Sequence, residues 1–350
     1  MSSVLPPALR FCRALFRRRA APTIAFLGVL LAGPTLAIPI DDYPDVEKLI
    51  ESLAKAHGFE RAALRRLFAD ATLRPDIIAA IERPREALPW HEYRKIFITD
   101  ERVRLGASYW QRHKKTLARA ERDYGVPAEL IVAIIGVETR YGANKGEYAT
   151  IDALLTLTLG FPRRADFFRR ELEEFLLLAR ELKIDPRKVK GSYAGALGIP
   201  QFIPSSYRRY AIDFDGDRKR DLLQNDEDAI GSVANFLRSH GWDPGKPVID
   251  LAQIDSTLYL WPEQLGLQPG LRLREWLSHG IFPRPDPAQA GMPLDTERPA
   301  ALVLLEGETG PLYHLGYNNF YVISRYNRSK SYAMAVYELA RSIRRQHEGT

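Results

Sequence analysis

Apolar residues recur at intervals of three and four over much of the first third of the chain. The pattern covers residues 45–83 and 99–124, and its clearest positions are Val46, Leu49, Ile50, Leu53, Leu64, Leu67 and Phe68. This is the period of an amphipathic helix, which buries one stripe of side chains and exposes the other. The same period returns over 163–182 and 228–239, and a last helix is predicted over about 331–345. The sequence therefore predicts a mainly helical protein.

Two short segments near the end of the chain have the composition of strands. Residues 300–305 and 319–324 are rich in aliphatic, β-branched or aromatic side chains, and glycine and asparagine bound them, which is typical of β-strands. Upstream, residues 243–299 are dense in proline, which indicates a loop-rich connection. The predicted fold class is mainly α with a small β subdomain, an α+β protein.

The first 37 residues have the pattern of a signal peptide. Residues 1–19 contain five arginines and no acid, an apolar run follows over 24–36, and Thr35-Leu36-Ala37 has the small-x-small form of a cleavage site. We expect cleavage after Ala37 and export. The alternative, an uncleaved membrane anchor, requires an apolar span of about 20 residues, and glycine and proline interrupt this run. Pro34 stands where a lipid anchor needs its cysteine, so no lipid anchor is expected.

Charge and cysteine content exclude two classes of function. The chain has 50 basic and 44 acidic residues, and five of the basic ones lie in the predicted signal peptide. The 313 residues that remain after cleavage carry 45 basic and 44 acidic side chains, a net charge of +1. Binding to nucleic acid depends on an excess of cations, so no nucleic-acid partner is expected. Cys12 is the only cysteine, and its place in the signal peptide excludes disulfides and a thiol nucleophile from the mature protein.

A carboxylate stands near the end of the most apolar predicted helix. Pro127 is placed to begin this helix, and Glu138 lies four residues before Gly142, which is placed to end it. The apolar positions between them are Leu130, Ile131, Ile134, Ile135 and Val137. Burial and the negative end of the helix dipole both favour the neutral form of a carboxyl group here, as a general acid for a glycosidic oxygen requires. The alternative is a structural ion pair with an arginine.

No second carboxylate completes a conventional glycosidase pair, in which two acids lie about 5–10 Å apart. Glu129 is nine residues before Glu138, about 900° of helix rotation, and therefore points to the opposite face. Glu147 and Asp152 follow without a supporting pattern. This absence favours chemistry in which the N-acetyl group or a hydroxyl of the substrate takes the second role.

Residues 191–202, GSYAGALGIPQF, combine small residues with polar edges. Gly195 and Gly198 allow the backbone to approach a ligand closely, while Ser192, Tyr193 and Gln201 offer hydrogen-bonding groups. Such a surface suits a sugar chain. Tight packing of small residues is the alternative interpretation.

An aspartate-rich loop follows with the spacing of an EF-hand calcium loop. Its predicted ligands are Asp213, Asp215, Asp217, the carbonyl of Lys219, and Asp228 as the residue that closes the site. The match is partial, because Arg218 replaces the usual glycine at position six and Gln224 stands where a bidentate glutamate is expected. Hard oxygen ligands fit a structural Ca²⁺, and a solvated Asp-Gly turn is the alternative.

Five motifs follow one another along the chain: GVETRYG, SYAGALGIPQFIPSSYRRYA, DFDGD, DAIGSVANFLRSHGW and YNNFYVISRYNRSKSYAMAV. In this order they resemble the lytic murein transglycosylase B family of bacteria, over nearly the whole mature chain. The resemblance implies a periplasmic enzyme that cleaves the β-1,4 bond between N-acetylmuramic acid and N-acetylglucosamine in peptidoglycan without water, leaving a 1,6-anhydromuramyl end. Peptidoglycan glycan strands are the implied partner, other cell-wall enzymes are candidate partners, and a monomer that needs no catalytic cofactor is expected.

The resemblance also assigns roles to residues. Glu138 matches the family's single catalytic acid and base. The residues that match substrate contacts are Ser192, Gln201, Tyr326, Asn327, Tyr332 and Arg164. Among these, Tyr332 would support Glu138 and Arg164 would meet the acidic peptide stem. Phe236 departs from the family, where tyrosine can occur, so any hydroxyl contact from this position is missing.

The implied fold is a lysozyme-like core between a helical domain and a small β domain. The expected divisions are 1–37 for the signal peptide, 38–115 with part of 243–290 for the helical domain, 116–242 for the core with the EF-hand-like loop 213–228, 291–325 for the β domain, and 326–350 for a C-terminal segment and helix packed on the core. Two alternative functions remain, a non-catalytic peptidoglycan-binding scaffold and a hydrolytic muramidase. The first would lose Glu138 and the second would need a second carboxylate.

Overall fold

The computed structural model describes residues 36–37, 43–83, 87–255, 266–284 and 294–349. The predicted signal peptide, with Cys12, lies outside these ranges except for its last two residues. Those two form β1 (Leu36–Ala37), which pairs antiparallel with β2 (Thr72–Leu73). Among the helices within the described ranges, none is long and apolar enough to cross a membrane.

The first helical group contains α1 (Pro44–His57), α2 (Arg61–Ala69) and α3 (Pro75–Ile81). α1 packs on α2, and α3 packs on α8 (Thr150–Gly160), which lies along α9 (Ala165–Leu182). The buried stripe of α1 is Val46, Leu49, Ile50 and Leu53, as the period of three and four predicts. The helix prediction for 45–83 and 163–182 is therefore confirmed for the described residues.

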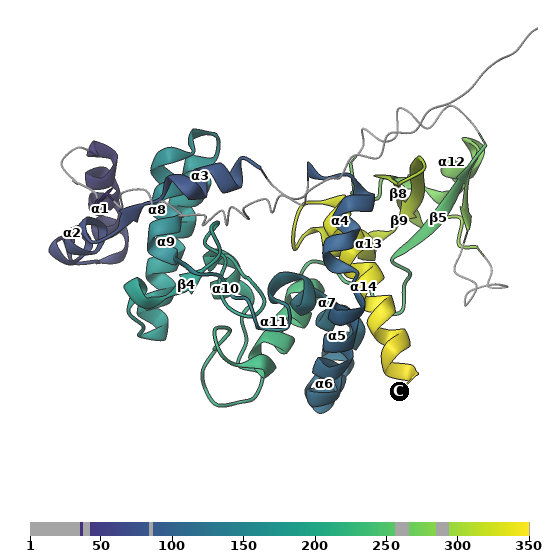
Figure 1. The fold of residues 1–350 in the computed structure, drawn as a ribbon, viewed down its shortest axis with the longest axis horizontal. Helices are drawn as coiled ribbons and strands as arrows, with labels where there is room; N and C mark the ends of the chain where they lie inside the picture. Colours follow the sequence, from purple (N-terminus) through teal and green to yellow (C-terminus); the bar gives the residue numbers. More distant parts are fainter. Residues whose placement is uncertain (1–35, 38–42, 84–86, 256–265, 285–293, 350) are drawn as a thin grey trace, which may run out of the picture. The chain divides into compact units, whose positions relative to one another are not determined.

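The second helical group surrounds α7 (Ala128–Thr139). Its members are α4 (Trp90–Phe97), α5 (Asp100–Arg112), α6 (Lys114–Tyr124), α11 (Asp226–Ser239) and α14 (Lys330–Glu348). α5, α6, α11 and α14 all contact α7 (Figure 1). Nine of its twelve residues are buried, so this helix is apolar on most faces because neighbours cover it on several sides.

Shorter elements connect these groups. They are the 3₁₀ turns Pro162–Arg164 and Pro186–Lys188, α10 (Pro204–Tyr210), and the two-residue strands β3 (Tyr148–Ala149) and β4 (Lys190–Gly191), which pair antiparallel. α10 packs on α9 and α11. The segment between β4 and α10 is thereby fixed at both ends.

A five-stranded antiparallel sheet follows α11. Its strands are β5 (Ile249–Ile254), β6 (Leu271–Arg272), β7 (Ile281–Arg284), β8 (Pro299–Glu306) and β9 (Pro311–Gly316), in the order β6-β8-β9-β5-β7. The register places Leu302 opposite Leu315. These two residues form a separate small core with Trp276 of α12 (Leu273–Ser278). The strand prediction for 300–305 is confirmed.

One prediction for this region is wrong, and another is incomplete. Residues 319–324 are not a strand but most of α13 (Asn318–Ser324), whose buried Phe320 and Ile323 are three residues apart on one helical face. Tertiary packing on both faces outweighs the strand propensity of these residues. Residues 243–299 are less loop-rich than expected, because β5, β6, α12 and β7 lie in this range. Backbone pairing places β5 and β7 in the sheet, not in the helical part. The division into domains otherwise stays a prediction.

Candidate functional site

Glu138 lies in the last turn of α7, where the chain then turns sharply. Arg140 and Tyr141 both have left-handed backbone conformations (φ 52° and 61°), and Gly142 follows with φ 83°. Left-handed conformations are uncommon for residues other than glycine and recur at functional sites. Tyr141 is held there because its hydroxyl donates to the Arg102 carbonyl at 2.7 Å. Gly136 leaves room for the ring, since a Cβ there would lie 2.7 Å from it.

Tyr332 holds the Glu138 carboxyl group. Its hydroxyl donates a hydrogen bond of 2.6 Å to Glu138 Oε1, and its side chain is 2% exposed. Burial, together with the charge of Glu138, raises the pKa of the Tyr332 phenol well above its ordinary value, so this group remains a donor. Ser329 caps the start of α14 by accepting from the Tyr332 backbone N–H. The structure thus fixes both the partner of Glu138 and the turn that carries it.

Tyr326 extends this arrangement toward the glycine-rich segment. Its ring stacks on Tyr332, with centroids 6.3 Å apart, and its hydroxyl donates to the Pro200 carbonyl at 2.7 Å. Burial raises the pKa of this phenol as well. Phe236 also packs against this ring in an edge-on contact, with centroids 4.8 Å apart. A phenylalanine at 236 therefore supports Tyr326 from within an aromatic cluster, where a hydroxyl is not needed for packing.

The segment 191–202 is folded back on itself and joined to α7. The hydroxyl of Ser192 accepts from the backbone N–H groups of Ala194 and Ala196. Thr139, the residue after Glu138, donates from its hydroxyl to the Ile199 carbonyl at 2.7 Å. Gly198 has φ 71°, and a Cβ there would lie 2.2 Å from the Leu222 carbonyl oxygen. Small residues therefore serve close backbone packing here, and this packing brings Gln201 into the site.

Gln201 is half-buried in a left-handed conformation with φ 52°. Its side-chain amide donates to the carbonyls of Lys145 (3.1 Å) and Gly198 (2.9 Å). The turn after Glu138 contains Lys145, so Gln201 ties this turn to the glycine-rich segment. A strained glutamine with its N–H groups engaged presents its carbonyl oxygen as the remaining polar group.

Asn327 and Arg164 are the remaining residues expected to contact substrate, and this expectation stays a prediction. Asn327 is half-buried between Tyr326 and the start of α14, and its backbone carbonyl accepts from the Ser329 N–H. Arg164 is exposed before the first turn of α9, where its guanidinium lies 4.2 Å from the centre of the Phe167 ring. The structure therefore links Glu138 to Tyr332 and Tyr332 to Tyr326, and Tyr326 binds Pro200, the residue before Gln201. The contacts given for Arg164 lie outside this chain.

Other carboxylates considered as partners for Glu138 are engaged elsewhere. Glu129, at the start of α7, pairs with Arg344 at 2.9 Å. Asp152 accepts from the Thr72 backbone N–H at 3.0 Å. Arg140, an arginine close to Glu138 in sequence, pairs with Glu101. Among these carboxyl groups, that of Glu138 accepts from the buried Tyr332.

Asp213, Asp215 and Asp217 converge in the loop before α11. One carboxylate oxygen from each lies within 4.8 Å of the others. The loop is shaped by these side chains, since Asp213 accepts from the N–H groups of Gly216 (2.7 Å) and Arg218 (2.8 Å). Hard carboxylate oxygens at this separation suit Ca²⁺, so the donor set fits the predicted metal.

Asp228 binds the backbone of the same loop. It is fully buried, and its two oxygens accept from the backbone N–H groups of Phe214 and Asp221, both at 2.7 Å. It is not part of the cluster of three. Sequence reasoning missed Asn225, which caps α11 and donates to Asp215 Oδ2 at 2.7 Å. This bond is the largest cause that lowers the pKa of Asp215, and the signal for it was an asparagine directly before an acidic helix start.

The comparisons with known proteins cover most of the chain. A family described as the transglycosylase SLT domain matches residues 41–341. The membrane-bound lytic murein transglycosylase B of Escherichia coli K12 is 39% identical over 310 residues, which cover 86% of this chain and 82% of that protein.

Solved structures of lytic transglycosylases also match this chain. The soluble lytic transglycosylase SltB1 of Pseudomonas aeruginosa is 45% identical, with a TM-score of 0.78, and covers 88% of this chain and 100% of that one. Slt35 of Escherichia coli, solved in complex with calcium, is 38% identical over 89% and 96% of the two chains, with a TM-score of 0.77. SltB3 of Pseudomonas aeruginosa, in complex with NAG-NAM-pentapeptide, is 32% identical over 85% and 78%, with a TM-score of 0.72. These matches confirm the predicted lysozyme-like α+β fold class.

Proposed function

The chain belongs to the transglycosylase SLT domain family, and we propose that it is a lytic transglycosylase that cleaves peptidoglycan through Glu138. The bond is the β-1,4 linkage between N-acetylmuramic acid and N-acetylglucosamine, and the product is a 1,6-anhydromuramyl end. The observation that carries the proposal is the Glu138 carboxyl group, held by buried Tyr332 at 2.6 Å inside the matched family region.

Glu138 acts first as an acid and then as a base. Its proton passes to the glycosidic oxygen as the bond from C1 of the muramyl residue breaks, and the muramyl 2-acetamido group or the protein stabilises the cation. The Glu138 carboxylate then removes the proton from the C6 hydroxyl, whose oxygen bonds to C1. The cycle restores the neutral acid and adds no water to the products.

The surroundings of Glu138 support a mechanism with one carboxyl group. Glu129 and Asp152 are bound to other groups, so neither is placed as the base of a hydrolytic pair. We assign Ser192 and Gln201 as contacts of the sugars near the scissile bond, and Tyr326 and Asn327 as residues that line the cleft. Arg164, exposed at the start of α9, meets an acidic peptide stem.

The protein works in the periplasm after cleavage near Ala37, where peptidoglycan lies. The E. coli relative is a membrane-bound enzyme by name, whereas the leader of this chain has Pro34 in place of a lipid-bearing cysteine. The uncleaved leader is the alternative means of attachment. Mass spectrometry of the N-terminus of the protein purified from cells distinguishes the two.

Mass spectrometry of the muropeptides released from purified peptidoglycan tests the reaction. The proposed chemistry gives products lighter by one water than hydrolysis products. Products with free reducing ends would instead show a hydrolytic muramidase. Wall binding without any released product would leave a non-catalytic scaffold.

We expect Ca²⁺ to stabilise the loop of Asp213, Asp215 and Asp217. Binding at a concentration of about ten times Kd adds ~1.4 kcal/mol to the free energy of unfolding, which raises Tm by about 2 °C for a chain of this size. Differential scanning calorimetry in EDTA, in Ca²⁺ and in Mg²⁺ measures the shift. Asp217→Asn removes one charged ligand and is expected to abolish the rise in Tm that Ca²⁺ causes. Equal Tm in EDTA and millimolar Ca²⁺ would contradict the site.

A further inference from the structure

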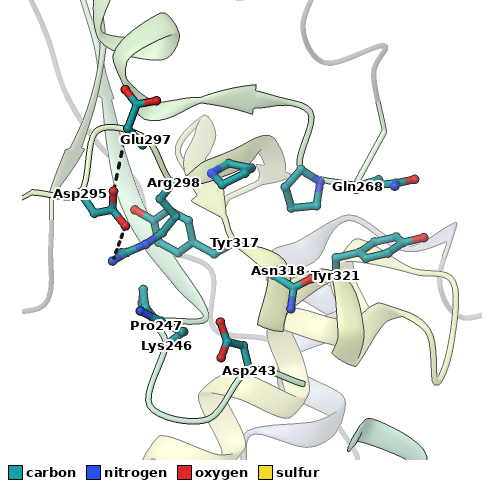
Figure 2. Close-up of a pocket in the computed structure, with 12 residues that line it drawn as sticks. Asp243, Lys246, Pro247, Gln268, Asp295, Glu297, Arg298, Tyr317, Asn318 and Tyr321 are labelled. Atoms are coloured by element: carbon teal, nitrogen blue, oxygen red, sulfur yellow. Dashed lines mark hydrogen bonds and ion pairs between the residues drawn. The ribbon is translucent and has the colours of Figure 1, made fainter. Parts of the chain in front are cut away.

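A pocket of 410 Å³ lies at the junction of the sheet and α13, away from the residues that contact Glu138. Four segments line it: residues 243–247, 268–269 and 295–299, and the start of α13 with the residue before it (Figure 2). Its volume falls within the range of about 300–1,000 Å³ that is usual for small-ligand sites. None of the catalytic, substrate-binding or metal-binding residues predicted from the sequence lines this pocket.

A buried asparagine fixes the loop on one side of this pocket. Asn319 is fully buried, and its side chain donates to the carbonyls of Asp243 (2.8 Å) and Lys246 (2.9 Å) and accepts from the Asp243 N–H (2.9 Å). Trp242, next to the loop, donates from its indole to the Gly125 carbonyl at 2.9 Å. The backbone is thus held to the core, while the side chains of Asp243 and Lys246 are exposed. Figure 2 shows Asp243 directed toward the pocket.

The opposite side is equally rigid. Tyr317 is 2% exposed, and its hydroxyl donates to Asp250 Oδ2 at 2.6 Å. The guanidinium of Arg298 lies 5.2 Å from the centre of this ring and 3.7 Å from Asp295 (Figure 2). Pro247, Pro269 and Pro299 line the same pocket. The pocket therefore has a preformed wall of rigid rings, which loses little conformational entropy on binding.

The charges of the pocket leave one cation and one anion available. Glu297 pairs with Arg272 and Arg274, and Arg298 pairs with Asp295. Within the described ranges, no ion pair engages Lys246 or Asp243. An ammonium and a carboxylate three residues apart on a fixed loop match a ligand that bears both a carboxylate and an ammonium group. The proline and tyrosine rings suit the aliphatic part of such a ligand.

The position of the pocket relative to Glu138 suggests the source of that ligand. α13 has seven residues, about 10 Å of helix. The pocket lies at its start, and Tyr326, which packs beside Tyr332, follows two residues after its end. A glycan strand bound at Glu138 could therefore extend a peptide stem to the pocket. Such stems end in a carboxylate and carry a free ammonium group where their diamino acid is not cross-linked.

We propose that this pocket is an accessory site for the zwitterionic, uncross-linked peptide stem of peptidoglycan, with Lys246 binding the carboxylate and Asp243 the ammonium. The proposal rests on the function proposed above, because it takes the stem from the same polymer. It makes the enzyme sensitive to cross-linking, since acylation of the amine removes the charge that Asp243 recognises.

Calorimetric titration of the full-length protein with a synthetic stem pentapeptide tests the site without any need for activity. The wild type is expected to bind the peptide with a free side-chain amine about fivefold more tightly than the same peptide with that amine acetylated, the effect of one partly exposed ion pair of ~1 kcal/mol. Asp243→Asn keeps the shape of the loop and is expected to remove this preference. Lys246→Glu is expected to weaken binding of both peptides by at least the same factor.

Lys115→Glu is the matched control, because Lys115 is an exposed lysine of α6 outside the pocket. It is expected to bind both peptides as the wild type does. The site is overturned if the wild type does not distinguish the two peptides, or if Lys246→Glu binds like Lys115→Glu. If the wild type bound the peptides as expected but released no anhydromuropeptides from peptidoglycan, the proposed function alone would be overturned.

Discussion

Glu138→Gln is expected to lower kcat on peptidoglycan by about three orders of magnitude or more. General acid and base catalysis each contribute about 10²–10⁴-fold, and one residue supplies both here. The glutamine side chain keeps the shape of glutamate, and its oxygen can still accept from Tyr332, whose hydroxyl lies 2.6 Å from Glu138 Oε1. KM and Tm are therefore expected to change little. Release of anhydromuropeptides, followed by liquid chromatography and mass spectrometry, measures the rate.

Glu147→Gln makes the same chemical change nine residues further along the chain. Glu147 is exposed in the turn that follows Glu138, so this variant is expected to keep the rate of the wild type. A Glu138→Gln protein that retained a tenth of the rate, or a Glu147→Gln protein that lost it, would show that another group carries the proton.

The position of Glu138 could be predicted because local pattern alone determines it. A proline and a run of apolar residues set the start and the burial of α7, which covers Ala128–Thr139. The helix ends before the predicted glycine, because Arg140 is already left-handed. The same holds for α1 and α14, where one buried stripe recurs at three and four. Signals of this kind lie within one helix and need no knowledge of what packs against it.

The elements that were mispredicted depend on distant partners. α13 has the composition of a strand, but Phe320 and Ile323 pack into the main core while Asn319 binds the loop of Asp243. β5 and β7 pair with each other although α12 lies between them in the sequence. The density of prolines, which includes Pro283 within β7, indicated loops instead of strands. Proline is tolerated in edge strands, and β7 is at the edge of the sheet.

The functional site likewise has one part that a local pattern predicts and another that depends on contacts between distant residues. Glu138 could be singled out from its helix, whereas its contact with Tyr332 joins residues 194 positions apart and was expected only through the family resemblance. In the pocket, Tyr317, Asn318 and Tyr321 belong to the last of the five motifs, but Asp243 and Lys246 belong to none of them. It exists because three segments that are distant in sequence meet the start of α13, which no short segment of sequence encodes.

Asp228→Asn is expected to lower the free energy of unfolding by about 2–4 kcal/mol. The carboxylate is fully buried and accepts from two backbone N–H groups at 2.7 Å, and such charge-assisted bonds are short and strong. An amide keeps one acceptor oxygen but turns an NH₂ group toward the other N–H, which leaves two donors face to face without water. Urea unfolding measures the loss.

Glu227→Gln is the control, because Glu227 is the preceding residue in the same first turn of α11 and makes one ion pair of 4.0 Å with Arg119. Its loss is expected to be below ~1 kcal/mol. Running both variants in EDTA and in Ca²⁺ separates two roles for Asp228. If it ties the loop to α11, the full loss appears in EDTA, whereas a residue that acted only as a metal ligand would cause a loss in Ca²⁺ alone. Its contacts, both to backbone N–H groups, favour the first outcome.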